Sequence, residues 1–285
     1  MHLFRQPQKA HELATSWQAS RQTIGFVPTM GCLHEGHMSL VKAAREHCDR
    51  VVVSIFVNPL QFGKNEDFGS YPRPFARDVE MCKAVGVDMI FHPDRAEFYP
   101  RNFRTRIESG SIGKLYCGKS RPGFFDGILT VVNILFNIIK PSQAYFGEKD
   151  FQQLHLIKQL VRDFRIPTKV IGMPIVREAS GLAMSSRNEY LKDDQRAAAL
   201  CLSRALKLAQ TAYREGDTNG LSLMRKVEEF LRTESAFSFD YAQIVDETTL
   251  DLITGEISRP ARLLLAGYMG SAPRIRLIDN DTVNR

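Results

Sequence analysis

Short apolar runs alternate with amphipathic stretches along the first 176 residues, and this alternation constrains the fold more than any other feature. Residues 50–57 form a continuous apolar run, which is typical of a strand buried on both faces of a parallel sheet. Residues 35–48 place apolar side chains on one side of a predicted helix. Further strands are predicted at residues 23–28, 87–91, 103–109, 143–146 and 168–176, and further helices at residues 75–85, 127–139 and 151–164. This order predicts βαβ units in an α/β fold, with a Rossmann-like, doubly wound parallel sheet.

The pattern changes after Tyr190. Two helices, at residues 194–214 and 221–233, are followed by strands at residues 239–245, 262–268 and 274–278. Helices followed by strands indicate a small α+β domain. We therefore expect a Rossmann-like domain at residues 1–176 and a smaller C-terminal α+β domain at residues 177–285.

Charge and cysteine content narrow the class of protein. The formal net charge is +6, from 38 basic and 32 acidic residues, and no block of consecutive basic residues occurs, so nucleic acid is not the expected partner. The 5 cysteines are widely spaced without a C-x-x-C pair, which argues against a disulfide framework or a zinc ribbon and for a reducing compartment. Residues 1–10 lack an apolar signal core, and the apolar stretch 128–139 is too short to span a bilayer. These features predict a cytoplasmic protein without a membrane partner.

The strongest local motif is Pro-Thr-Met-Gly-Cys-Leu-His-Glu-Gly-His at residues 28–37. A strand ends, a glycine turn follows and a helix begins near His34, which makes an anion site from free amides and the helix dipole. His34 and His37 are three residues apart and share a helix face, where two imidazoles can stabilise charge on a transferring phosphoryl group. The alternatives are a helix-capping histidine beside a merely polar one, or a zinc site, for which no further ligand cluster is present.

A second motif, Gly-Leu-Ala-Met-Ser-Ser-Arg-Asn, occupies residues 181–188. Its hydroxyls and the Arg187 guanidinium suit a polyphosphate, although such a sequence is also ordinary turn chemistry. In combination with H-x-G-H upstream, it resembles the two-part signature of nucleotidyl-transferring Rossmann-like enzymes, the class that contains class I aminoacyl-tRNA synthetases.

A third motif, Phe-Gly-Glu-Lys-Asp-Phe-Gln-Gln at residues 146–153, lies at a strand-to-helix junction. Gly147 permits close approach of the backbone to a ribose or base, Lys149 offers a point charge for phosphate, and Asp150 can cap the helix or hold ribose hydroxyls. A plain capped turn with a solvated lysine is the alternative interpretation.

Residues 113–120 match the phosphate-loop pattern G-x-x-x-x-G-K-[ST]. That mechanism requires a helix to begin directly after the Lys-Ser pair, so that its N-terminus faces the phosphates. Arg121-Pro122-Gly123 follows instead, and the helical pattern is delayed to Gly127. We therefore do not expect a phosphate loop here.

Together these motifs resemble the pantothenate synthetase (pantoate–β-alanine ligase) family. The matching segments are residues 28–37, 56–63, 66–73, 146–153 and 176–188, in the order and spacing of the family, over residues 23–191. The resemblance implies a two-step reaction: ATP and (R)-pantoate form a bound pantoyl adenylate and release pyrophosphate, and the amine of β-alanine then attacks the acyl carbon to give pantothenate and AMP. An acyl adenylate is already activated, so the protein must orient reactants, neutralise phosphate charge and exclude water.

The resemblance also assigns residues. It implies an ATP site that contains Met30, Gly31, Cys32, Leu33, His34, Glu35, Gly36, His37, Gly147, Glu148, Lys149, Asp150, Val176, Met184, Ser185, Ser186 and Arg187. The implied catalytic groups are His37, His34, Lys149 and Arg187, with His37 in the acid role. Gln61 and Gln153 would hold pantoate, Asn58 and Tyr71 would border the pocket, and Asp78 is the candidate to help hold Mg²⁺ beside the phosphates. A homodimer is likewise implied by the resemblance alone.

The sequence departs from the family pattern at three positions: Cys32 where Ala is usual, Phe124 where His is common, and Asn133 where Lys is common. The change at Phe124 removes a side chain that could contact phosphate there. The main alternative function is another adenylate-forming or nucleotidyl-transferring enzyme of the same superfamily. Gln61 and Gln153 favour pantoate over an amino acid, whose ammonium group would require a carboxylate. An RNA-binding role that uses the basic excess is the third alternative.

Overall fold

The computed structural model describes residues 1–63, 66–270 and 274–284, which form two compact units. The first unit contains Met1–Glu148 and Leu156–Pro174, and the second contains Lys149–His155 and Ile175–Arg285. The predicted domain boundary at residue 176 stays a prediction. The two units alternate along the chain, since residues 149–155 already belong to the second unit.

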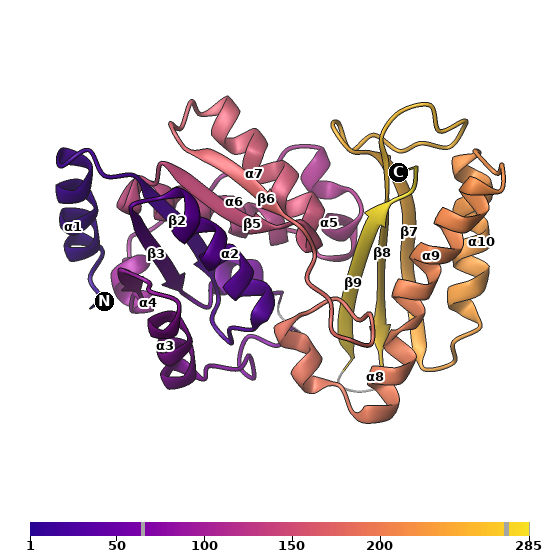
Figure 1. The fold of residues 1–285 in the computed structure, drawn as a ribbon, viewed down its shortest axis with the longest axis horizontal. Helices are drawn as coiled ribbons and strands as arrows, with labels where there is room; N and C mark the ends of the chain where they lie inside the picture. The colour runs from indigo at the N-terminus through magenta and orange to yellow at the C-terminus, as the bar shows by residue number, and fades with distance from the viewer. Residues whose placement is uncertain (64–65, 271–273, 285) are drawn as a thin grey trace. The chain divides into compact units, whose positions relative to one another are not determined.

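The first unit contains a six-stranded, fully parallel sheet with the order β1-β4-β3-β2-β5-β6, of which Figure 1 labels β2, β3, β5 and β6. Its strands are β1 (His2–Phe4), β2 (Ile24–Thr29), β3 (Arg50–Ile55), β4 (Met89–Phe91), β5 (Gln143–Gly147) and β6 (Lys169–Met173). From β2 the chain proceeds outward through β3 and β4, and then returns to the other side of β2 with β5. The strand order therefore reverses between β2 and β5, which is where open α/β sheets bind ligands, beyond the carboxyl ends of the strands.

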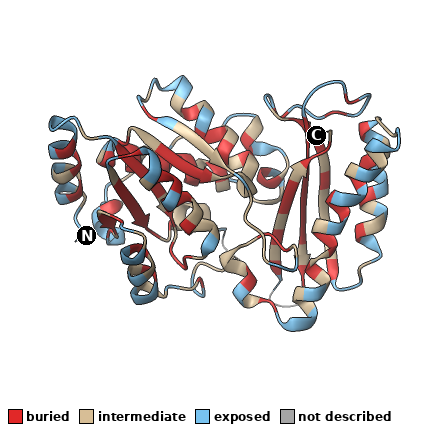
Figure 2. Ribbon diagram, in the orientation of Figure 1, coloured by how far each residue is buried: buried red, intermediate tan, exposed pale blue. Residues whose placement is uncertain are grey.

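Helices cover both faces of this sheet, as the doubly wound prediction requires. The helices of the unit are α1 (Pro7–Ala19), α2 (Glu35–His47), α3 (Phe75–Ala84), α4 (Arg95–Phe98), α5 (Cys117–Ser120) and α6 (Phe124–Ile139), and α7 (Phe151–Asp163) begins in the second unit. Successive residues of β2 point to opposite faces. Val27 belongs to a core with α2 and α3, whereas the Phe26 ring contacts Phe136 of α6. The central strands β2, β3 and β4 are mostly buried, as Figure 2 shows for β2 and β3, whereas the edge strand β6 is only half-buried.

The predicted strand at residues 103–109 is wrong, because this segment has no regular structure. Two of its backbone amides bond to side chains of α6 instead of to a neighbouring strand. Ile107 N–H donates to Thr130 Oγ1 at 3.0 Å, and Ser109 N–H donates to Asp126 Oδ1 at 2.8 Å.

Further differences concern the start of one helix and the N-terminal elements. Helix α6 begins at Phe124, three residues before the predicted start, with Gly123 at φ 80° as its N-cap. The short strand β1 and helix α1 at the N-terminus were not predicted. Residues 113–120 match the phosphate-loop pattern in sequence only. Lys119 and Ser120 end the short helix α5 and do not open a helix, so the geometry of a phosphate loop is absent from these described residues.

The second unit contains an antiparallel sheet of β7 (Phe237–Asp246), β8 (Ala261–Met269) and β9 (Ile275–Thr282). Its helices are α8 (Asp193–Ala199), α9 (Cys201–Arg214) and α10 (Gly220–Arg232). The apolar sides of α9 and α10, which include Leu206 and Val227, pack on the sheet residues Ile244 and Leu265. The single helix predicted at residues 194–214 is divided at Leu200 into α8 and α9. The α+β prediction for the C-terminal region is confirmed.

All five cysteines are buried, and none of them is in a disulfide bond. None of the helices in the described part of the chain combines the length and the apolar composition needed to cross a bilayer.

Candidate active site

The loop that follows β2 carries the first motif to the point where the strand order reverses. Gly31 has φ 81° and Cys32 has φ 51°, so two successive residues adopt the left-handed conformation before α2 begins. A Cβ on Gly31 would lie 2.9 Å from both Asp78 Oδ2 and Ile55 Cγ2, so only glycine fits this position. The loop is therefore a tight, specific turn that delivers His34 to the start of α2.

Most amides of this loop are bound by the protein itself. Gly31 N–H donates to Thr29 Oγ1 at 3.1 Å, and the Thr29 hydroxyl donates to Ser54 O at 2.7 Å. Within the part of the chain that the structure describes, the amides of Glu35 and Gly36 have no protein acceptor. These two first-turn amides, together with the dipole of α2, are the groups available to an anion.

The two histidines of the motif lie face to face at the start of α2. His34 is the N-cap, and the centroids of the two imidazole rings are 4.0 Å apart. His34 N–H donates to Nδ1 of His37 at 3.4 Å. A ring that accepts a hydrogen bond at Nδ1 carries its proton at Nε2 in the neutral form. The capping contact therefore selects the form of His37 that presents an N–H donor at the far edge of the ring.

Gln61 lies at the end of the short helix η1 (Pro59–Gln61), in a network that fixes its side chain. Its Oε1 accepts a hydrogen bond from Asn58 Nδ2 at 3.0 Å, and its Nε2 lies 3.1 Å from the sulfur of Met30. Asn58 is 1% exposed, and its amide group also contacts Gly127 O and Tyr99 Oη at 3.0 and 2.9 Å. Asn58 thus positions Gln61, and Met30 links Gln61 to the loop after β2.

An arginine that was not among the predicted site residues anchors the segment after Gln61. Both Nε and Nη2 of Arg121 donate to the carboxylate of Glu66, and Nη2 also donates to Gln61 O at 3.1 Å. The guanidinium carbon lies 3.5 Å from the centroid of the Phe124 ring, a cation–π contact. Tyr71, which is 4% exposed, packs its ring edge-on against Phe62 in the same loop. The charge pair spans 55 residues, so sequence spacing offered no signal for it.

The strand β5 ends at Gly147, and Glu148 follows at the start of the short helix η3 (Glu148–Asp150). This places the beginning of the third motif at the carboxyl end of the strand that neighbours β2. The remaining residues of that motif belong to the second unit, where Asn280 Nδ2 donates to Lys149 O at 2.8 Å. Lys149, Asp150 and Gln153 are half-buried.

The second motif forms a loop within the second unit that brings Val176 next to Met184. Met184 N–H donates to Val176 O at 3.0 Å, and Ser185 Oγ accepts from Arg187 N–H at 3.3 Å as the N-cap of η4 (Ser186–Tyr190). Glu178 stabilises this loop. Its Oε1 accepts a hydrogen bond from Asn188 Nδ2 at 3.0 Å, and its carboxylate pairs with Arg196 at 2.7 Å. The predicted nucleotide residues of this segment are thus neighbours on one braced loop.

Asp78, the candidate metal residue, binds the backbone of the loop that follows β2. Its side chain is 1% exposed, and its two carboxylate oxygens accept the amides of Cys32 and Leu33 at 2.9 and 2.8 Å. Among the residues that the structure describes, no group of three or more His, Cys, Asp or Glu side chains is placed to hold a metal ion. The metal role of Asp78 beside the ATP phosphates stays a prediction.

Comparison with known proteins covers the whole chain. A family model described as pantoate-beta-alanine ligase matches residues 2–282. A pantothenate synthetase from Caldicellulosiruptor bescii is 46% identical over 276 residues, which cover 97% of this chain and 96% of that protein. One from Thermotoga petrophila is 45% identical over 280 residues, which cover 98% and 99% of the two chains.

Solved structures agree with these relatives. The crystal structure of pantothenate synthetase from Thermus thermophilus is 42% identical, covers 100% of both chains and superposes with a TM-score of 0.92. A pantoate-beta-alanine ligase from Francisella tularensis, solved in a complex with beta-gamma ATP and beta-alanine, is 38% identical, covers 99% of this chain and 97% of that one, and has a TM-score of 0.77. The motifs at the reversal of the strand order, the whole-length family match and these structures lead to one conclusion: the chain belongs to the pantoate–β-alanine ligase family.

Proposed function

We propose that this protein is an AMP-forming ligase that condenses (R)-pantoate with β-alanine at the expense of ATP. The observation that carries this proposal is the placement of H-x-G-H and Gly147 after neighbouring strands on either side of the reversal of the strand order, in a chain that matches the ligase family from residue 2 to residue 282. The relative from Francisella tularensis, whose structure contains beta-gamma ATP and beta-alanine, supports the substrate assignment.

In the first step, a carboxylate oxygen of pantoate attacks the α-phosphorus of ATP. The bond from that phosphorus to the bridging oxygen breaks, and pyrophosphate leaves with the bond electrons. In the second step, the neutral amine of β-alanine attacks the acyl carbon, the bond from carbon to the AMP oxygen breaks, and the nitrogen loses a proton. Neither step requires a covalent enzyme nucleophile, so catalysis consists of orientation and charge stabilisation.

The two imidazoles at the start of α2 are the proposed donors to the phosphate oxygens. The Nε2–H of His37, selected by the contact of Nδ1 with His34 N–H, would stabilise the charge that develops on the leaving pyrophosphate. Lys149 and Arg187 add positive charge, and Arg187 is suited to bidentate phosphate contacts. Gly147, Glu148 and Asp150 are proposed to hold the ribose and phosphates, Val176 the adenine, and Met184, Ser185 and Ser186 the triphosphate.

Pantoate is assigned to Gln61 and Gln153, whose amides offer both a donor and an acceptor to hydroxyl and carboxylate groups. Asn58 and Tyr71 would border this substrate. Magnesium would arrive with the ATP phosphates, which are its usual ligands at such sites. A homodimer and a cytoplasmic location are further parts of this proposal that rest on the resemblance to the family and, for the location, on the cysteine content.

Gln61→Ala is expected to raise the KM for pantoate by about 10- to 100-fold, because a hydrogen bond to a charged group is lost, and to leave the KM for ATP nearly unchanged. Initial rates measured with each substrate varied in turn give both constants. The matched control is Gln8→Ala, because Gln8 is exposed and its side chain donates to Glu12 of the same helix at 3.0 Å. Equal increases in both KM values would contradict the assignment.

The function itself is tested by measuring AMP and pyrophosphate release from MgATP, with pantoate and β-alanine supplied separately and together. We expect sustained release of AMP only when both substrates are present. Pantoate alone should give one equivalent of pyrophosphate and a bound adenylate. If neither substrate stimulates turnover, the ligase assignment fails and another adenylate-forming activity must be sought.

A further inference from the structure

The loop that carries H-x-G-H is held in place from a neighbouring helix. Asp78 is the fourth residue of α3, and its carboxylate lies beneath the turn formed by Gly31 and Cys32. Oδ2 accepts the amide of Cys32 at 2.9 Å and Oδ1 accepts the amide of Leu33 at 2.8 Å. Each oxygen thus binds a different amide of the same turn, so the carboxylate fixes the orientation of the loop backbone as well as its position.

This arrangement matters because the turn is costly to form. Cys32 adopts φ 51°, a region that non-glycine residues enter rarely and that costs about 1 kcal/mol or more. The two hydrogen bonds to Asp78 are charge-assisted and buried, which makes them the strong class of hydrogen bond. They offset the conformational cost, and the chain leaves the turn directly into His34, the N-cap of α2.

Asp78 lies where the fold accommodates a negative charge. It lies in the first turn of α3, where the helix dipole favours a negative charge. Cys82 follows one helical turn later and is 0% exposed, and burial raises the pKa of its thiol to about 12, with the Asp78 charge as a second cause. The thiol therefore stays neutral and adds no competing negative charge beside Asp78.

We propose that Asp78 is a positioning residue for adenylate formation, which holds the amides of Cys32 and Leu33 so that His34 and His37 meet the phosphates in a fixed orientation, and that it does not hold Mg²⁺. This inference rests on the proposed function. Each oxygen of Asp78 already accepts a loop amide, and the residue is only 1% exposed, whereas Mg²⁺ usually keeps several of its waters; direct coordination would therefore compete with the two hydrogen bonds that hold the turn.

Asp78→Asn tests the proposal because asparagine has nearly the same shape but only one acceptor atom. Its NH₂ group must face one of the two loop amides, so one hydrogen bond becomes a donor–donor contact. We expect kcat for pyrophosphate release to fall by about 10- to 100-fold, since small displacements of catalytic groups have effects of that size. The Mg²⁺ concentration that gives half-maximal rate at fixed ATP should not change.

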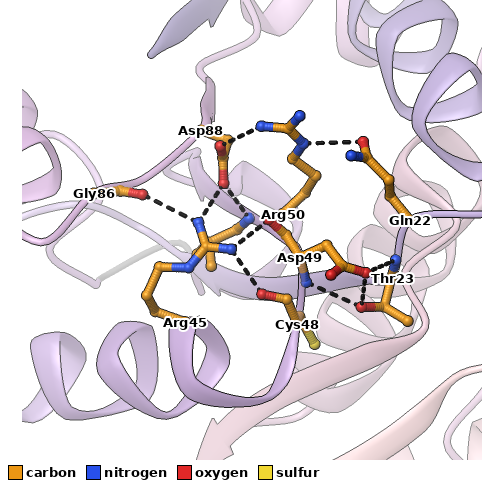
Figure 3. Close-up of polar contacts among 9 residues, drawn as sticks. Gln22, Thr23, Arg45, Cys48, Asp49, Arg50, Gly86 and Asp88 are labelled. Atoms are coloured by element: carbon orange, nitrogen blue, oxygen red, sulfur yellow. Dashed lines mark hydrogen bonds and ion pairs between the residues drawn. The ribbon is translucent and has the colours of Figure 1, made fainter. Parts of the chain in front are cut away.

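Asp88 offers a matched control near the amino ends of the parallel strands, whereas the H-x-G-H loop follows the carboxyl end of β2. Asp88 also binds a backbone amide and two arginines: it accepts Val51 N–H at 2.7 Å, and it pairs with Arg45 at 2.7 Å and with Arg50 at 3.1 Å (Figure 3). Val51 is at the amino end of β3, away from the motif. Asp88→Asn should lower the thermal midpoint and leave kcat unchanged, which separates loss of position from general loss of stability.

The results that would overturn the proposal are equally specific. An unchanged kcat in Asp78→Asn would show that Asp78 is dispensable. A raised Mg²⁺ requirement, with activity restored by excess Mg²⁺ or Mn²⁺, would show that Asp78 is a metal ligand. If this variant does not fold, the metal role is tested on the wild-type protein, by measuring Mn²⁺ binding with electron paramagnetic resonance. We expect no bound Mn²⁺ without nucleotide and binding in proportion to added ATP; Mn²⁺ retained by the nucleotide-free protein would contradict the proposal. Failure of the wild type to release AMP would instead count against the proposed function, because Mn²⁺ binding does not depend on turnover.

Discussion

Replacing His37 with asparagine is expected to slow adenylate formation by about 100- to 1,000-fold, because one donor to the developing phosphate charge is lost. The asparagine Oδ1 occupies the place of Nδ1 and can still accept the hydrogen bond from His34 N–H. The N-terminus of α2 should therefore keep its cap, and the thermal midpoint should change little. The rate is measured as a single turnover of pyrophosphate release with β-alanine omitted.

His37→Gln provides the complementary variant. The glutamine amide reaches the place of Nε2 and can donate from there, but it loses the capping contact at Nδ1. We expect this variant to retain more activity than His37→Asn and less stability. The opposite order of activities would mean that the ring acts through its cap and not as a phosphate donor.

His47 supplies the control for both variants. It lies on the same helix α2, and its Nδ1 contacts Ala43 O at 2.9 Å in the last turn. His47→Asn and His47→Gln change the same atoms at the other end of the helix and should leave the rate of adenylate formation unaltered. A comparable loss in these variants would show that any histidine change in α2 disturbs the enzyme.

The sequence identified the strands of the parallel sheet well, because strands buried on both faces are continuous apolar runs. It was less informative where the neighbours of a segment decide its structure. Residues 103–109 have the composition of a strand, but Thr130 and Asp126 on α6 take the amides of Ile107 and Ser109, so no ladder forms. The strand β1 has only three residues, too few for a periodic signal.

The same distinction applies to the candidate site. The motif after β2 was predicted because its residues are contiguous, and strand, glycine turn and helix follow one another in the sequence. The partners that hold it in place are remote: Asp78 lies 46 residues after Cys32, and Glu66 lies 55 residues before Arg121. Without such contacts, a carboxylate near a proposed nucleotide site is most simply interpreted as a metal ligand, and only the fold shows that its oxygens bind backbone amides.

Gly127→Ala should destabilise the protein and impair pantoate binding together, although helix propensity alone predicts the reverse. Alanine in the interior of a helix is favoured over glycine by about 1 kcal/mol. At Gly127 of α6, however, an added Cβ would overlap the carbonyl oxygen of Leu60 and lie 2.8 Å from the backbone nitrogen of Gln61. Backbone atoms cannot rotate away as a side chain can, so the steric cost should reach about 3 kcal/mol and outweigh the propensity gain.

The displaced element is η1, which carries Gln61, and Gly127 O also accepts the hydrogen bond from Asn58 that fixes this turn at 3.0 Å. The thermal midpoint should therefore fall and the KM for pantoate should rise, while the KM for ATP changes less. Gly69→Ala is the control, because a Cβ there meets no atom within 4 Å and its φ is not positive. A Gly127→Ala protein that is more stable than the wild type would mean that α6 and η1 can separate without loss. The close approach of the two backbones would then have no part in holding Gln61 where the proposed function requires it.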